Sequence, residues 1–182
     1  MPFPKKYAET AARLRVPAGF LVAAVFLLLA QPTPRSFVAG VGIALCGLAI
    51  RAWAAGHLRK NLELTVSGPY GYVRNPLYLG SLIVALGCAV AGAHWGVGVV
   101  LAGFFIFFYL PVVGEEEGHL EKILPGYSGY RREVPRLRPR IPPYRGEPRA
   151  FSFAQYRKNR EYEALGAFLI VLAVLAAKLW LL

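Results

Sequence analysis

Two short polar segments carry the residues that could do chemistry in this chain. The first is Gly68-Pro69-Tyr70-Gly71-Tyr72-Val73-Arg74-Asn75-Pro76-Leu77-Tyr78-Leu79-Gly80, which runs directly into an apolar helix. Asn75 is a favourable helix N-cap and Pro76 suits the first turn, so the free N–H groups and positive dipole end of the helix would lie beside Arg74. This combination predicts a site for a carboxylate or phosphate at a membrane surface. An ordinary helix cap with a lipid-facing arginine is the simpler explanation of either feature alone.

The second segment is Gly114-Glu115-Glu116-Glu117, which ends another apolar run. Carboxylates at the end of a spanning helix are ordinarily just solvated, and that explanation stays open for this segment taken by itself. Two polar motifs at the boundaries of neighbouring apolar runs together favour a ligand site.

The long apolar runs around these motifs indicate an integral membrane protein. Of the 182 residues, 56% are hydrophobic and 17% are charged, and the apolar residues gather in runs. About 20 apolar residues are needed to cross ~30 Å of hydrocarbon. We therefore expect an all-α membrane protein with a single domain over residues 1–182. Its five expected spans are 17–33, 36–56, 77–93, 95–113 and 164–182. A signal peptide is the competing explanation of the first run, but no small-residue cleavage site follows it.

The basic residues predict the orientation of these spans. The formal net charge is +11, and all Lys and Arg residues except Arg35, Arg51 and Lys178 lie before the first span, in the second loop or in the fourth. The positive-inside rule places the N-terminus and the loop 114–163 in the cytoplasm and the C-terminus outside. The expected location is a bacterial inner membrane. Nucleic acid is not an expected partner, because anionic lipid headgroups explain a basic cluster beside a membrane.

The loop 114–163 is too rich in Tyr, Leu and Ile to be a mere linker. We expect a short helix through about 115–133, followed by extended chain across four prolines. This part of the loop is expected to fold back over the first motif. Residues 151–163 have the pattern of an interfacial amphipathic helix that leads into the last span.

Small and polar residues inside the spans carry further expectations. Five glycines should permit close helix packing: Gly40, Gly42, Gly47, Gly80 and Gly87. Five spans suffice for a monomeric site, while lipid-facing glycines could equally pair two copies, so the oligomeric state stays open. Cys46 and Cys88 should behave as small buried hydrophobes. Lys178 can extend to the outer surface, and Arg51 can extend inward or point into a polar cavity. The histidines are scattered, so no metal site is expected.

Three motifs in order carry a resemblance to a known family. They are Gly68-Pro69-Tyr70 with Arg74-Asn75-Pro76-Leu77-Tyr78-Leu79-Gly80, then Glu116-Glu117-Gly118-His119-Leu120, then Tyr127-Ser128-Gly129-Tyr130-Arg131-Arg132-Glu133-Val134-Pro135. Over about residues 40 to 140 the chain resembles bacterial members of the isoprenylcysteine carboxyl methyltransferase (ICMT) family and the related phospholipid methyltransferases.

The resemblance implies a cofactor, S-adenosyl-L-methionine, covered by the loop after the fourth helix. The residues that it implies as cofactor contacts are Tyr70, Arg74, Asn75, Pro76, Leu77, Tyr78, Glu116 and Glu117. The chain departs from the family pattern at three places. Asn75 replaces the His of eukaryotic members, Val112 and Val113 occupy the stretch of a substrate-binding arginine, and Leu124-Pro125-Gly126 replaces a Phe-Gly pair.

A methyltransferase of this kind needs no protein nucleophile, because the cofactor carries the reactive sulfonium. A carboxylate acceptor is already ionised at neutral pH, whereas an amine acceptor must lose a proton. The candidate proton acceptors are Glu116, Glu117 and Glu161, besides water. The arginines that could hold an anionic headgroup are Arg131, Arg132, Arg157 and Arg160.

Three functions stay open on these grounds. The first is carboxyl O-methylation of a prenylated or otherwise lipidic acceptor, and the second is N-methylation of a phospholipid headgroup. The third is a non-enzymatic bundle that binds lipid or scaffolds partners. Specific cofactor binding separates the third function from the first two.

Overall fold

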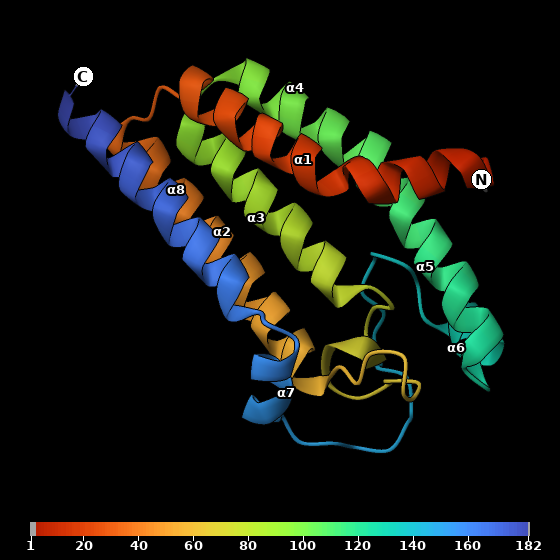
Figure 1. The fold of residues 1–182 in the computed structure, drawn as a ribbon. Helices are drawn as coiled ribbons and strands as arrows, with labels where there is room; N and C mark the ends of the chain where they lie inside the picture. The colour runs from red at the N-terminus through yellow and green to blue at the C-terminus, as the bar shows by residue number, and fades with distance from the viewer. Residues whose placement is uncertain (1–2, 182) are drawn as a thin grey trace.

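The computed structural model describes residues 3–181, and every regular element in this range is helical (Figure 1). The elements are α1 (Lys5–Leu29), α2 (Pro34–His57), η1 (Gly68–Gly71), α3 (Pro76–Gly92), α4 (Trp95–Phe104), η2 (Phe105–Tyr109), α5 (Leu110–Ile123), α6 (Tyr127–Glu133), α7 (Phe153–Lys158) and α8 (Tyr162–Leu181). The segment η2 is a π-helical turn, and it joins α4 and α5 into one continuous helix.

Four helices within the described range are long and apolar enough to cross a membrane. They are Lys6–Leu29, Pro34–His57, Trp95–Ile123 and Tyr162–Leu181. The expectation of an all-α membrane protein is therefore confirmed. The helix α3 is equally apolar but has 17 residues. At 1.5 Å per residue it covers about 25 Å, close to the lower limit for a span, so the expected count of five stays a prediction.

The connections gather at two ends of the bundle. At one end, which we call the loop end, the chain between α2 and α3 lies beside α6, α7 and the segment that joins them (Figure 1). At the far end, the backbone N–H of Gln31 donates to the Gly92 carbonyl at 2.7 Å. The Lys178 ammonium also reaches this end, where it donates to the carbonyls of Leu27 at 2.8 Å and Ala30 at 2.6 Å. The lysine thereby satisfies carbonyls that the end of α1 leaves without helical partners.

Three expected helix boundaries are wrong. The first apolar helix runs over Lys5–Leu29 instead of 17–33, because Pro17 is accommodated inside it. The fourth does not end at 113 but continues through the glutamates to Ile123. The helix expected over 115–133 is interrupted at residues 124–126, where Gly126 has a φ of 82°. This left-handed conformation suits glycine and allows α6 to start in a new direction.

The helices α2 and α3 pack closely through four of the five expected glycines. A Cβ atom on Gly40 would lie 2.4 Å from the backbone of Ala91, and one on Gly87 would lie 2.5 Å from the backbone of Ala44. Gly47 and Gly80 form a second close contact of the same kind. Gly42 was expected here but faces open space, because its position lies on the other side of α2. Cys46 is exposed for the same reason, contrary to the expected burial, while Cys88 is partly buried.

Candidate functional site

The Glu117 carboxylate is the centre of a polar cluster at the loop end of the bundle. Its side chain is 1% exposed. The Asn75 amide Nδ2 donates to Glu117 Oε1 at 2.8 Å. The Arg136 guanidinium donates to both carboxylate oxygens, with an Nη2 to Oε2 distance of 2.6 Å. Arg74 Nη2 lies 3.4 Å from Oε1. The first two sequence motifs therefore meet at this carboxylate.

The chain between α6 and α7 brings Arg136 to the cluster. Backbone hydrogen bonds join Arg74 N to Pro135 O at 2.9 Å and Asn75 N to Arg136 O at 3.2 Å. Further along, Tyr144 N donates to Gly71 O at 2.7 Å. The loop therefore folds back over the first motif, as the sequence predicted. A small apolar core fastens it there: Leu124, Tyr127, Tyr130 and Val134, with Leu64, Val66, Leu120 and Tyr144 packed against them.

Asn75 occupies the N-cap position of α3 and Pro76 lies in the first turn, as expected. The Asn75 side chain, however, accepts no capping hydrogen bond from the helix. It donates to Glu117 instead, because an ionised carboxylate is a stronger acceptor partner than a neutral group. The expected capping role of the side chain is therefore wrong. The buried Nε of Arg74 has no hydrogen-bond partner among the described residues.

Glu116 differs from its neighbour Glu117 because its side chain is exposed. It lies beside the hydroxyl of Tyr78, which also accepts a hydrogen bond from Arg15 Nη1 at 3.1 Å. The Tyr78 ring makes an edge contact with Tyr109 in the π-helical turn, with ring centroids 5.6 Å apart. Glu117 is thus buried and held by neighbouring side chains, whereas Glu116 is exposed and can contact a ligand.

Three tyrosines at the loop end are buried: Tyr70, Tyr127 and Tyr130. Burial raises the pKa of Tyr70, and the nearby Glu161 and Glu116 carboxylates raise it further. Burial likewise raises the pKa of Tyr127 to about 12. The Tyr130 hydroxyl donates to the Tyr70 carbonyl at 2.7 Å. These phenols stay protonated at neutral pH, so they can donate hydrogen bonds but cannot serve as bases.

Glu161 lies apart from Glu117, in a second buried cluster. Its carboxylate pairs with Arg51, with a distance of 2.5 Å between Arg51 Nε and Oε1. Arg51 Nη1 also donates to the Ser81 hydroxyl. Sequence reasoning named Glu161 but missed its partner. The signal available in the sequence was Arg51 itself, because an arginine inside an apolar span requires a counter-charge.

The four arginines expected to hold a substrate headgroup lie on the exposed surface. Arg131 pairs with Glu121 at 2.6 Å and Arg160 pairs with Glu163. Arg132 and Arg157 are also exposed. Among residues 3–181, none of the four forms an ion pair with the candidate carboxylates at 116, 117 and 161.

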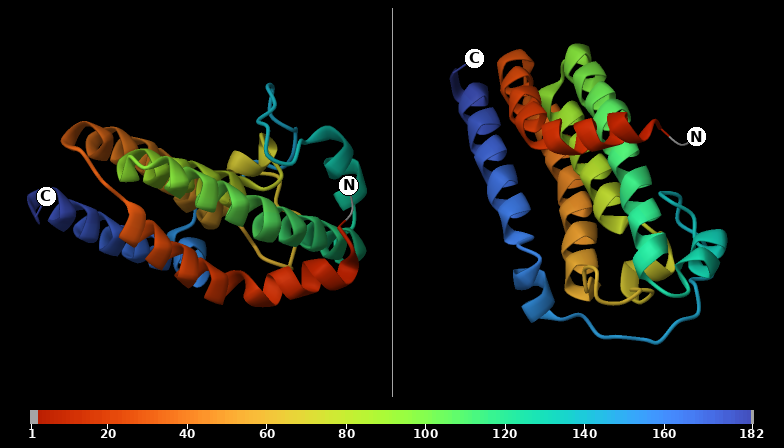
Figure 2. Two further views of the ribbon diagram at one scale, coloured as in Figure 1. Left: turned by 90° about the horizontal axis from the view of Figure 1, so that it is seen from above. Right: turned by 45° about the vertical axis from the view of Figure 1, so that its right-hand side comes forward.

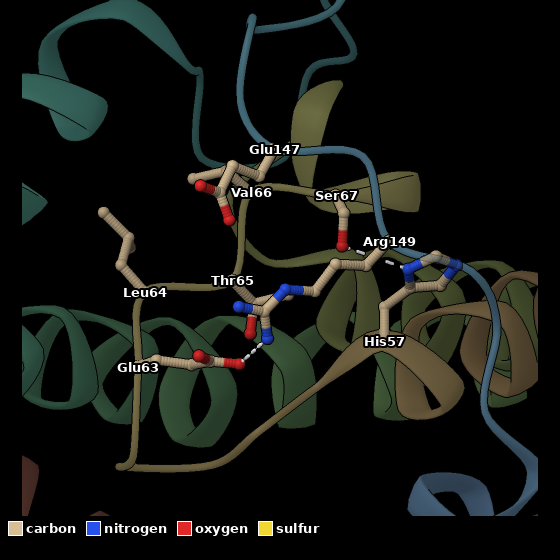
Figure 3. Close-up of a pocket in the computed structure, with 8 residues that line it drawn as sticks. All are labelled: His57, Glu63, Leu64, Thr65, Val66, Ser67, Glu147 and Arg149. Carbon is tan, nitrogen blue, oxygen red and sulfur yellow. Dashed lines mark hydrogen bonds and ion pairs between the residues drawn. The ribbon is translucent and has the colours of Figure 1, made fainter.

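A separate cavity of about 180 Å³ opens beside the end of α2 (Figure 3). It is lined by His57, Glu63, Leu64, Thr65, Val66, Ser67, Glu147 and Arg149. An ion pair joins Glu63 to Arg149, and His57 Nδ1 lies 3.1 Å from Ser67 Oγ. None of the residues expected from the sequence to bind cofactor or substrate lines this cavity. The part of the chain that the structure describes holds no group of three or more His, Cys, Asp or Glu placed to bind a metal ion.

The fold and site define a helical membrane protein whose polar motifs converge at one end of the bundle. Residues 37–126 match the family model described as phospholipid methyltransferase, which confirms the expected resemblance. The match includes Asn75, Glu116 and Glu117, while Arg15, Arg136 and Glu161 lie outside it.

Two curated proteins are similar to the chain over 110 residues. The cobalt-zinc-cadmium resistance protein CzcN of Cupriavidus metallidurans is 37% identical, over 59% of this chain and 50% of that protein. The nickel-cobalt-cadmium resistance protein NccN of Alcaligenes xylosoxydans xylosoxydans is 31% identical, with the same shares of both chains. The chain thus spans about half the length of the curated relatives that it matches. No solved structure matches it.

Proposed function

We propose that the chain is an S-adenosyl-L-methionine-dependent methyltransferase that acts on a lipidic acceptor at the membrane. The observation that carries this proposal is the convergence of the two family motifs on Glu117, with Glu116 left exposed beside them. We further propose that the loop end faces the cytoplasm of a bacterial inner membrane, with the C-terminus outside.

The residues at the loop end fit the polar groups of the cofactor. Its carboxylate would meet the unpartnered Nε of Arg74 at the start of α3, where the helix dipole also favours an anion. The exposed Glu116 carboxylate would accept hydrogen bonds from its ammonium or ribose hydroxyls. Tyr70 and Tyr78 would pack on it. When bound, the cofactor supplies a methyl group on a positively charged sulfur.

The buried Glu117 has a different part in this proposal. Because Glu117 is bound by Asn75, Arg74 and Arg136, it holds the start of α3 in place. It likewise holds the chain between α6 and α7, which we call the covering loop. We therefore assign cofactor contact to Glu116 and positioning to Glu117. The covering loop would exclude water and align the acceptor with the methyl group.

The acceptor that we favour is a lipidic carboxylate, such as an isoprenylcysteine. One carboxylate oxygen forms the new bond to the methyl carbon while the bond from that carbon to sulfur breaks, and no proton moves. N-methylation of a phospholipid headgroup is the alternative, for which Glu116 is the carboxylate best placed to receive the amine proton because it is exposed.

Cofactor affinity of purified variants tests the proposal. In equilibrium binding of S-adenosyl-L-methionine, we expect Glu116→Gln to weaken binding by about tenfold, equivalent to ~1.4 kcal/mol. The adjacent Glu115→Gln is the matched control and should bind as the unmodified chain does. Glu117→Gln should lower thermal stability as well, because two arginines lose their buried counter-charge. If the unmodified chain does not bind this cofactor, the non-enzymatic bundle becomes the better reading.

Transfer of labelled methyl to lipid and prenylcysteine acceptors distinguishes the two reactions. Label that alkali releases as methanol identifies a methyl ester and supports O-methylation. Label that stays in a lipid headgroup under alkali identifies N-methylation and overturns the favoured acceptor.

A further inference from the structure

We infer that Arg15 and the Tyr78 hydroxyl form a binding site for the anionic headgroup, carboxylate or phosphate, of a lipid-like molecule. The inference deepens the proposed function and rests on it for the role of this molecule as methyl acceptor. Arg15 lies in α1, outside the residues 37–126 that match the family.

The first half of α1 is fixed against the middle of the α4–α5 helix. Figure 2 shows this half crossing the bundle obliquely before the rest of α1 runs alongside the other helices. Ala8 and Ala11 are buried, and the Tyr7 hydroxyl donates to the Phe107 carbonyl at 2.7 Å. Phe107 belongs to the π-helical turn between α4 and α5. This contact fixes the position from which Arg15 reaches α3.

The charge of Arg15 has little compensation in the structure. Its side chain is partly buried and donates one hydrogen bond, from Nη1 to Tyr78 Oη at 3.1 Å. Arg15 forms no ion pair with any carboxylate of residues 3–181. Arg51 shows the contrast, since all three of its side-chain nitrogens donate to acceptors and it has a carboxylate partner. A guanidinium has five N–H donors, so an anion could accept several of those that Arg15 has left.

The position of Arg15 connects it to the candidate cofactor site. The Tyr78 hydroxyl that accepts its hydrogen bond also lies beside Glu116, the exposed carboxylate that we assign to the cofactor. An anion held by Arg15 would therefore lie close to the Tyr78 hydroxyl, which Glu116 also adjoins. The headgroup would be aligned beside the methyl group, and an apolar tail could lie along the lipid-facing surface of α1.

Binding of matched amphiphiles to the full chain in phosphatidylcholine nanodiscs tests the inference. The anionic molecules are laurate and dodecyl phosphate, and dodecanol is the uncharged comparison. We expect Arg15→Gln to weaken binding of both anions by about tenfold and to leave dodecanol unchanged. Arg15→Lys should retain much of the affinity because it keeps the charge. Arg13→Gln is the matched control, since Arg13 is exposed on the same helix.

If the contact between Arg15 and Tyr78 only stabilises the fold, the binding measurements give a different result. If Arg15→Gln binds both anions as the unmodified chain does, or loses dodecanol to the same extent, the inference is overturned. Phosphatidylglycerol retention, measured by native mass spectrometry, identifies the source of the anion. Retention lost in Arg15→Gln indicates a membrane lipid, while unchanged retention with weakened laurate binding indicates a free acceptor.

The cofactor is measured in the same samples. Unchanged affinity of Arg15→Gln for S-adenosyl-L-methionine, with weakened anion binding, supports the inference and keeps it separate from the cofactor site. If the unmodified chain binds the anions but not the cofactor, the proposed function fails while the anion site stands.

Discussion

The Arg51 guanidinium and the Glu161 carboxylate form a two-point ion pair that joins α2 to the start of α8. Arg51 Nε lies 2.5 Å from Oε1, and Arg51 Nη2 lies 3.0 Å from Oε2. The two residues are 110 positions apart in the sequence. Since Arg51 also donates to Ser81 and to the Leu77 carbonyl, it holds α8 against both α2 and α3 beside the candidate site.

Removal of one partner of this pair is expected to destabilise the bundle more than removal of both. Arg51→Met leaves the carboxylate of Glu161 buried without a counter-charge, which should cost about 3 kcal/mol. The double variant Arg51→Met with Glu161→Met should recover part of this loss, because neither charge stays buried. Unfolding of each variant in detergent measures the coupling between the two positions. Simple additivity of the single effects would show that the pair does not act as a unit.

Substitutions at Asn75 should distinguish its contact with Glu117 from a capping role. Asn75→Ala removes one hydrogen bond to a buried carboxylate and should cost about 1–3 kcal/mol. Asn75→Asp keeps the shape and is a good N-cap residue, but it places a second negative charge beside Glu117. We expect Asn75→Asp to be less stable than Asn75→Ala in thermal unfolding. The reverse order would indicate that the side chain acts mainly as a helix cap.

The glycines of α2 offer a matched pair of positions. A Cβ atom on Gly40 would meet the backbone of Ala91 at 2.4 Å, whereas Gly42 has nothing within 4 Å of such an atom. Gly40→Ala should therefore separate α2 from α3 and cost about 1–3 kcal/mol. Gly42→Ala should be neutral or slightly stabilising, because alanine favours a helix. The measurement is thermal unfolding of both variants in the same detergent, and equal effects would contradict the packing of α2 on α3.

The sidedness of the bundle can be tested with reporter fusions. Alkaline phosphatase after residue 182 should be active, because we place the C-terminus outside. The same reporter inserted near residue 147 should be inactive, because we place the basic covering loop in the cytoplasm. Activity at both positions would contradict five spans with this orientation.

The sequence alone was sufficient to predict the membrane class, most helices and the two motifs of the site. Long apolar runs and helix-start residues such as Pro76 are local properties, so they can be read without the tertiary structure. The return of the covering loop over the first motif was also predicted, since its tyrosines and leucines required an apolar surface. The resemblance named both Glu116 and Glu117.

Only the tertiary structure separated the roles of these two glutamates. On a helix, adjacent residues point in directions about 100° apart, so one side chain can be buried while the other is exposed. Which one faces inward depends on how α5 packs against the loop that carries Arg136. The partners of Arg15 and Arg51 could not be predicted either, because each partner lies in another element of the fold, distant in sequence. Hydrophobic patterning places residues within a helix, whereas pairing between helices depends on their packing.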